Sequence, residues 1–242
     1  MLVAVISDIH ANLEALEAVL EDIDRVGADT VVCLGDVVGY GPDPNPCTEV
    51  VSKIAFACVA GNHDYAALGL TDITVFNIYA REAVLWTRSV LTEANRDYLR
   101  RCPLEDAFLG GWLVHGSPVE PEEWNYILSV GDARRAFERF DQALCFVGHS
   151  HVPGVFDLDP RGFVDVLQAA KVSFETDHRY IVNVGSVGQP RDWDPRAAYG
   201  LWDTEENSFE LRRLAYDVQT TQRKILAAGL PEFLATRLAI GQ

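Results

Sequence analysis

The sequence predicts a single domain of the α/β class, with an α+β character, over residues 1–242. We expect two packed mixed sheets with helices outside them. In the first half, continuously apolar runs alternate with helical patterns, which is typical of βαβ units with buried strands. In the second half, short apolar runs are separated by turns such as Asp159–Gly162, which indicates antiparallel hairpins.

Eight apolar runs are predicted to form the main strands: Leu2–Ser7, Thr30–Leu34, Ala55–Ala60, Trp112–Val114, Leu144–Val147, Arg179–Val184, Ala198–Trp202 and Phe209–Leu214. Two further runs, Gly154–Leu158 and Phe163–Leu167, are predicted to pair through a turn. The first run lacks the basic flank of a signal peptide, so we expect a core strand there.

Helical spacing of apolar residues predicts a helix over Asn12–Val26, with Asn12 as its N-cap and Gly27 ending it. Residues 73–101 are predicted to form an inserted pair of helices near the opening of the site. Residues 131–140 and 217–239 are predicted to form further helices, the last broken at Gly229–Pro231.

The composition excludes several classes of partner. The net charge is −16 and no basic face is visible, so long nucleic acids are not expected to bind. No apolar run reaches the ~18 residues that a membrane span needs. The five cysteines are odd in number and include no C-x-x-C pair, which predicts reduced thiols in a cytoplasmic protein.

Five of the six histidines lie in four short motifs that each follow a strand-like run: Asp8-Ile9-His10, Gly61-Asn62-His63-Asp64, His115-Gly116 and Gly148-His149-Ser150-His151. A fifth motif, Gly35-Asp36, follows another such run. Imidazoles and carboxylates are ligands for divalent transition metals. Sites in α/β sheets are built at the carboxyl ends of strands. The pattern therefore predicts a metal site assembled from five strands.

The spacing of residues within the motifs suggests which of them bind the same ion. Residues two apart in extended chain point the same way, so Asp8 and His10 are expected to share one ion. The same spacing recurs in His149 and His151. A carboxylate such as Asp36 can bridge two ions, and Asn62 offers a neutral oxygen ligand.

In this order the motifs resemble the calcineurin-like metallophosphoesterase family, specifically its small single-domain bacterial and archaeal members, over residues 1 to about 205. The resemblance implies a four-layer α-β-β-α sandwich and a dinuclear centre. It implies that Asp36 bridges two ions and that the other ligands divide into two sets: Asp8, His10 and His151, and Asn62, His115 and His149.

The resemblance also implies a reaction. A hydroxide bridging the two ions attacks phosphorus, while His63 stabilises the transition state or protonates the leaving oxygen. The mixed nitrogen and oxygen ligands suit Mn, Fe, Zn, Ni or Co alike.

One departure from the family concerns substrate. In its protein serine/threonine phosphatases, an Asp and an Arg follow the Gly-Asp motif, and that Asp pairs with the catalytic histidine. Here Gly39 and Tyr40 stand in those places. Phosphoprotein phosphatase activity is therefore not expected, and Asp43 and Asp64 are the alternatives for orienting His63.

Substrate contacts are predicted on two segments. The loop Asn183–Asp192 is either a simple glycine-rich turn or a site loop, in which case Ser186 and Arg191 contact substrate and Arg191 replaces the missing Arg. Asn77 and Arg81, four apart on the inserted helix, are further candidates. Tyr40 and Tyr126 could stack on a nucleoside or aryl group, or simply pack.

Together these features predict a hydrolase that acts on small phosphodiesters or phosphomonoesters. A nucleotide pyrophosphohydrolase, similar to a diadenosine tetraphosphatase, is the alternative enzyme. A non-catalytic scaffold of the same fold is the alternative of another class, and the complete ligand set disfavours it. The sequence leaves open whether the chain forms a homo-oligomer.

Overall fold

The computed structural model describes all 242 residues and contains twelve strands. These are β1 (Leu2–Ile6), β2 (Thr30–Cys33), β3 (Ala55–Cys58), β4 (Glu105–Phe108), β5 (Gly111–Val114), β6 (Leu144–Val147), β7 (Gly154–Leu158), β8 (Val164–Leu167), β9 (Lys171–Ser173), β10 (Arg179–Asn183), β11 (Ala197–Asp203) and β12 (Ser208–Leu214). They form two six-stranded sheets, ordered β3-β2-β1-β11-β12-β9 and β4-β5-β6-β10-β7-β8. Both sheets mix parallel and antiparallel neighbours, as expected.

Eight α-helices accompany the sheets: α1 (Leu13–Val26), α2 (Pro44–Ile54), α3 (Asn62–Leu68), α4 (Ile78–Val90), α5 (Glu93–Arg101), α6 (Val130–Phe137), α7 (Val218–Ala227) and α8 (Glu232–Thr236). Short 3₁₀ turns occupy Pro121–Glu123 and Arg237–Ile240. None of these helices is both long enough and apolar enough to cross a membrane.

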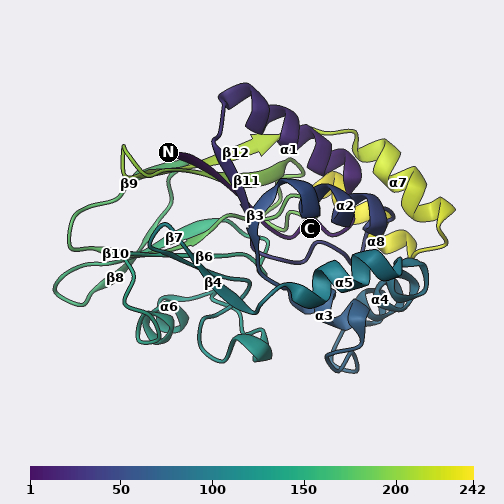
Figure 1. Cartoon of the computed structure of the whole chain (residues 1–242), viewed down its shortest axis with the longest axis horizontal. Helices are drawn as coiled ribbons and strands as arrows, with labels where there is room; N and C mark the ends of the chain where they lie inside the picture. Colours follow the sequence, from purple (N-terminus) through teal and green to yellow (C-terminus); the bar gives the residue numbers. More distant parts are fainter.

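The layers run helix, sheet, sheet, helix (Figure 1). Val5, Leu34 and Phe146 belong to the apolar core between the sheets. A second core packs α1 and α2 on the outer face of the first sheet, and a third packs α6 on the outer face of the second. The predicted fold class, including the four-layer arrangement, is confirmed.

Helix α1 shows why the first βαβ unit forms as predicted. The Asn12 side chain accepts a hydrogen bond from the Ala15 amide at its start, and Gly27 ends it in the left-handed conformation that glycine favours. Its buried stripe, which includes Leu16 and Val19, packs on the sheet. Burial of that stripe therefore fixes the chain segment that follows the first ligand loop.

Four elements were absent from our expectations: α2, α3, β4 and β9, of which β4 (Glu105–Phe108) is a four-residue strand at a sheet edge with only Phe108 buried. Prolines at positions 42, 44 and 46 suggest a loop, but Pro44 opens α2, where a missing amide costs nothing. Helix α3 begins directly at Asn62, so the Asn-His motif lies on a helix start instead of a loop. Strand β9 is only three residues long and lies at a sheet edge, where hydrophobic pattern gives little signal.

The inserted helical pair is present but shorter than predicted. Residues 73–77 are not helical, and Asn77 caps α4 by accepting a hydrogen bond from the Ala80 amide at 3.0 Å. Helix α4 packs through Ala80 and Ala83 against the C-terminal helices. The helix predicted at 131–140 spans Val130–Phe137, and the C-terminal one is broken as expected between α7 and α8.

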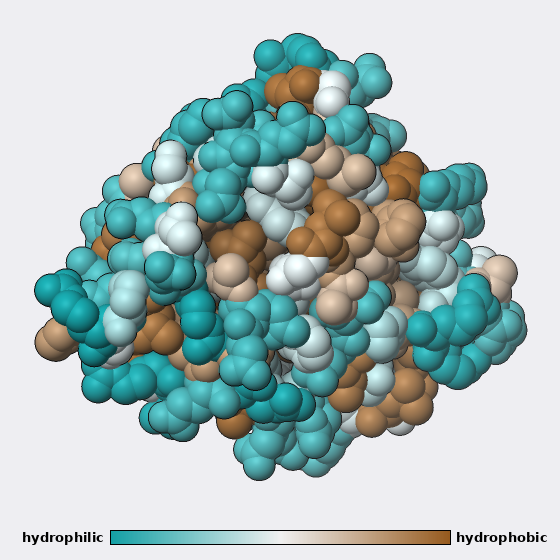
Figure 2. Space-filling view, turned by 60° about the vertical axis from the view of Figure 1, so that its left-hand side comes forward, coloured by the Kyte–Doolittle hydropathy of each residue, from teal (hydrophilic) through white to brown (hydrophobic).

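Most of the surface visible in Figure 2 is hydrophilic, in keeping with the net charge of −16, and hydrophobic residues gather toward the centre of that face. All five cysteines are free thiols.

Candidate metal centre

The predicted ligands all meet at the carboxyl ends of two groups of parallel strands. Strands β1, β2 and β3 run parallel in the first sheet, and β5 and β6 run parallel in the second. The segments that follow these five strands supply seven side chains, each no more than 7% exposed: Asp8, His10, Asp36, Asn62, His115, His149 and His151. Each of two clusters within this set takes residues from both sheets.

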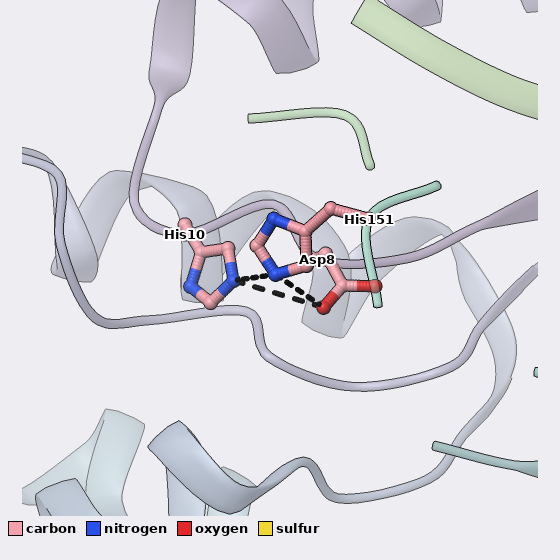
Figure 3. A group of neighbouring side chains, drawn as sticks. All are labelled: Asp8, His10 and His151. Atoms are coloured by element: carbon pink, nitrogen blue, oxygen red, sulfur yellow. Dashed lines mark hydrogen bonds and ion pairs between the residues drawn. The ribbon is translucent and has the colours of Figure 1, made fainter. Parts of the chain in front are cut away.

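The first cluster contains Asp8, His10 and His151, whose side chains point toward one another (Figure 3). The Nε2 atoms of the two imidazoles are 3.1 Å apart. Asp8 Oδ1 lies 3.7 Å from His10 Nε2 and 3.2 Å from His151 Nε2. Asp8 Oδ2 accepts hydrogen bonds from Ser7 and the His149 amide, whereas Oδ1 is buried with no donor.

The hydrogen bonds behind these imidazoles decide what the cluster can bind. His10 Nδ1 donates to the Val38 carbonyl at 3.2 Å, and His151 Nδ1 donates to the Gln189 carbonyl at 2.5 Å. In the neutral rings both Nε2 atoms are then acceptors. Two lone pairs and a carboxylate oxygen that converge without a donor fit a cation, and backbone partners of this kind orient metal-binding histidines.

The second cluster repeats this arrangement with Asp36, His115 and His149. His115 Nδ1 donates to the Leu34 carbonyl at 2.8 Å, while its Nε2 faces His149 Nδ1 at 3.1 Å and Asp36 Oδ2 at 3.3 Å. Asn62 Oδ1 is also buried, with no hydrogen-bond donor. The donor set again fits a cation.

Asp36 lies between the clusters. Its Oδ2 is 3.6 Å from His10 Nε2 as well as 3.3 Å from His115 Nε2. Its Oδ1 accepts the His63 amide at 2.8 Å. Asp36 Oδ2 thus faces histidines of both clusters, so Asp36 could contribute to both sites.

Burial and neighbouring charges shift the pKa values of three imidazoles in different directions. Burial alone would lower the pKa of His115, but the carboxylates of Asp36 and Asp8 outweigh it and raise the pKa to about 9. Burial and the nearby His115 lower the pKa of His149 to about 3, and burial and Arg191 lower the pKa of His151 to about 3. His149 and His151 are thus neutral near pH 7, the form that binds metal.

The backbone brings the paired ligands together differently from the expected extended chain. Asp8 and His10 have φ values of 52° and 50°, and His149 and His151 have values of 65° and 60°. These left-handed conformations are strained for residues other than glycine and cluster at functional sites. Tight turns, not a strand pleat, therefore aim each pair at a common point, so the physical reason we gave for the pairing was wrong.

Gly148 shows how closely the loops approach. A Cβ at this position would collide with the side chains of Ser7 and Asp8. Only glycine therefore fits between the β1 and β6 loops.

A cavity of about 280 Å³ opens above the clusters. It is lined by fourteen residues: Asp36, Tyr40, Asn62, His63, Val75, Phe76, Asn77, Ala80, Glu123, Trp124, Tyr126, His149, His151 and Arg191. The inserted segment thus lies at the site opening, as expected.

His63 lines this cavity between the rings of Tyr40 and Phe76, whose centroids are 4.3 and 5.1 Å away. Its buried Nδ1 has no partner, and a Cβ at Gly39 would lie 2.5 Å from that nitrogen. Gly39 therefore occupies the place from which an Asp would reach His63. Neither alternative takes over: Asp64 accepts the Gly61 and Val38 amides, and Asp43 pairs with Lys224.

Arg191 and Tyr40 form one wall together. The Arg191 guanidinium donates to the Tyr40 hydroxyl at 3.3 Å and to Gln189 Oε1 at 2.9 Å, and it makes no ion pair. Tyr40 is only 7% exposed and packs against His10 and His63. Tyr40 thus packs against the site histidines and also lines the cavity, so its stacking on a substrate group stays a prediction.

Two predicted substrate contacts, Ser186 and Arg81, lie outside the cavity lining. Ser186 is fully buried; its hydroxyl donates to the Asp8 carbonyl and accepts the Gln189 amide, so it shapes the ligand loop. Arg81 is exposed and does not line the cavity. Asn77 does line it, although its Oδ1 caps α4. Among the cavity residues that sequence reasoning missed, Phe76 and Trp124 are the largest, and their only sequence signal is proximity to other site segments.

The comparisons agree with this geometry. A sequence model of the calcineurin-like phosphoesterase superfamily domain matches residues 1–207. The crystal structure of a metallophosphoesterase from Sphaerobacter thermophilus is 40% identical, covers 100% of this chain and 99% of that one, and superposes with a TM-score of 0.87. The chain belongs to the calcineurin-like phosphoesterase superfamily.

Two curated relatives extend the comparison. The uncharacterized protein MJ0912 of Methanocaldococcus jannaschii is 41% identical over 247 residues, which cover 100% of this chain and 98% of the relative. Phosphodiesterase YfcE of Escherichia coli is 25% identical over 209 residues, which cover 82% of this chain and 85% of the relative. The family and this relative indicate a phosphoric ester hydrolase.

Proposed function

We propose that this protein is a dinuclear metal-dependent phosphoesterase that hydrolyses small phosphodiesters or phosphomonoesters. The observation that carries the proposal is the pair of carboxylate–imidazole clusters joined by Asp36. One ion is held by Asp8, His10 and His151, the other by Asn62, His115 and His149, and Asp36 faces both.

This ligand set suits Mn, Fe, Zn, Ni or Co. When bound, two such ions supply an activated water nucleophile and neutralise phosphoryl oxygens.

The chain contributes two further groups to this chemistry. His63 stabilises the transition state or acts on the leaving oxygen, with its ring held by Tyr40 and Phe76. Arg191 holds a non-bridging phosphoryl oxygen. Its guanidinium has no carboxylate partner despite the acidic composition, and guanidinium groups make paired, charge-assisted bonds to phosphate.

Diesters are the favoured substrates, and phosphoproteins are disfavoured because Gly39 leaves His63 without a carboxylate. The similarity to a named phosphodiesterase supports this preference. The alternative, a nucleotide pyrophosphohydrolase, is less favoured because Arg191 is the only cationic side chain lining the cavity. A polyphosphate chain would need further cationic side chains to balance its additional negative charges. The five free thiols support a cytoplasmic location.

The test uses protein stripped by a chelator and reloaded with Mn, Zn, Fe, Ni or Co in turn. Metal content and kcat/KM are measured for an aryl diester, an aryl monoester, a dinucleoside tetraphosphate and a phosphoserine peptide. We expect two ions per chain and the best kcat/KM for the diester. Full activity with one ion would refute the dinuclear centre, and preference for the tetraphosphate would favour the alternative.

A further inference from the structure

The cavity has two aromatic walls, one beside His63 and the other beside the predicted ligands His115 and His149. Phe76 lies beside His63, with ring centroids 5.1 Å apart. Trp124 and Tyr126 lie at the opposite cluster, where Trp124 is 6.0 Å from His115 and Tyr126 is 4.0 Å from His149. A phosphoryl group above the clusters would thus have one wall on each side.

The Trp124–Tyr126 wall is held in place by packing. The ring of Trp124 packs edge-on against Tyr65, with centroids 5.4 Å apart, and its plane makes an angle of 70° with that of His115. The backbone between Trp124 and Tyr126 is held by a hydrogen bond from the Ser117 amide to the Asn125 carbonyl at 2.8 Å. Tyr126 lies parallel to His149, at 14° between planes, yet 47% of the residue is exposed. One face of its ring is therefore packed, while the residue still exposes aromatic surface to the cavity and solvent.

Charge limits what this wall can accept. Glu123 is its only charged residue, and Arg191, the cavity's one cationic side chain, bonds to Tyr40 and lies near the Tyr126 hydroxyl. A second phosphate beside Trp124 would meet the Glu123 carboxylate, and the one cation in the cavity, Arg191, is already assigned to the scissile phosphoryl group. An uncharged planar group would instead meet aromatic rings. Aromatic side chains stack on many kinds of planar ring, because every such ring has a π-face.

We propose that Trp124 and Tyr126 form a subsite for a planar aromatic or heteroaromatic group on the non-leaving side of a single-phosphate diester. This rests on the proposed function, in which His63 acts on the leaving oxygen. The leaving group then lies toward Phe76, and the retained ester group lies toward Trp124 and Tyr126. The subsite selects the retained group, whereas the metal ligands and His63 act on phosphorus and the leaving oxygen.

The test holds the leaving group constant. Phenyl p-nitrophenyl phosphate and methyl p-nitrophenyl phosphate both release p-nitrophenolate and differ only in the retained group. We expect the metal-loaded protein to prefer the phenyl ester about tenfold in kcat/KM. The Trp124→Leu/Tyr126→Leu double variant should bring the ratio close to one, and Tyr126→Phe should keep it. Phe163→Leu, at an exposed ring outside the cavity, is the control.

Equilibrium binding gives a second readout that needs no turnover. Phenylphosphonate should bind the metal-loaded protein about tenfold more tightly than methylphosphonate, and the double variant should lose this difference while its metal content is retained. Equal affinities in the unmodified protein, or a preference that survives the double substitution, would overturn the subsite. Hydrolysis of both esters at equal kcat/KM would refute the subsite alone; a phosphonate preference without hydrolysis of either ester would refute the proposed function alone.

Discussion

Asp36 and His63 are joined by a hydrogen bond from the His63 amide, yet we assign their side chains different tasks. Asp36→Asn should lose metal along with activity, because its Oδ2 faces both clusters. His63→Ala should keep the metal and lose turnover by about 10²–10⁴. Metal analysis and kcat on the same preparations separate the two. Loss of metal from His63→Ala, with normal turnover per ion, would reverse the assignment.

Arg191 provides a second test at the residue scale. Arg191→Ala should reduce kcat/KM for the diester by roughly tenfold to a hundredfold, the range for a hydrogen bond to a charged group. Arg191→Lys should recover only part of the loss, since an ammonium cannot make paired bonds. Metal content should not change in either variant. An unchanged diester rate in Arg191→Ala would return the 183–192 loop to a purely structural role.

At this scale, the sequence predicted residue types with a distinctive chemistry better than those with an ordinary one. Imidazoles in short motifs after strands identified the clusters because histidine is scarce and packing does not explain its placement. Ser186 could not be judged in the same way, because a serine in a glycine-rich turn serves a ligand or the backbone equally well. Here its hydroxyl bonds to the Asp8 carbonyl and the Gln189 amide.

Among the elements, α1 is anchored to the first sheet by an ion pair between its buried Asp22 and the partly exposed Arg212 on β12. Asp22 on α1 accepts hydrogen bonds from Arg212 at 3.1 Å and from the Tyr199 hydroxyl at 2.7 Å. Burial alone would raise the pKa of Asp22, but the bonds from Arg212 and Tyr199 outweigh it and hold the pKa below its usual value.

A carboxylate with a depressed folded-state pKa stabilises the protein above its unfolded pKa of about 3.9. That contribution is lost as the pH falls through the lower, folded-state value. Asp22→Asn should therefore lower the free energy of unfolding by about 2 kcal/mol at pH 7, and the deficit should shrink below pH 4. Urea unfolding at several pH values checks this. Asp24→Asn, on the exposed side of the same helix, is the matched control, and an equal deficit there would contradict the prediction.

Elements were predictable where burial imposes a period or a continuous apolar run, as in α1 and β6. Helix α2 was missed because its prolines lie in the first turn, where the sequence looks the same as that of a loop. Only the packing of Cys47 and Val51 in the core shows that the segment is a helix. The start of α3 was missed for a related reason. A glycine before Asn62 suggests a turn equally well, and only the hydrogen bond from the Gly61 amide to the Asp64 side chain shows a helix cap.

For the whole molecule, the two clusters place buried carboxylates and imidazoles where the sheets meet, so metal should stabilise the fold. An ion at 100 times its dissociation constant contributes about 2.7 kcal/mol per site, and each kcal/mol raises Tm by about 2–4 °C in a chain of this size. Chelator-treated protein should therefore melt several degrees lower than reloaded protein. Asp36→Asn should abolish the shift, and His178→Ala, outside both clusters, should keep it. A Tm independent of metal would contradict this.

Each cluster takes its residues from both sheets, and this bears on the order of folding and metal binding. Neither sheet alone carries a complete set: His151 joins Asp8 and His10 from across the interface, and His115 and His149 join Asp36 and Asn62. A nascent chain with one sheet formed thus offers an incoming ion only a fragment of either coordination sphere. We therefore expect an ion to bind after the two sheets have docked, so that it would stabilise the assembled domain without nucleating its folding.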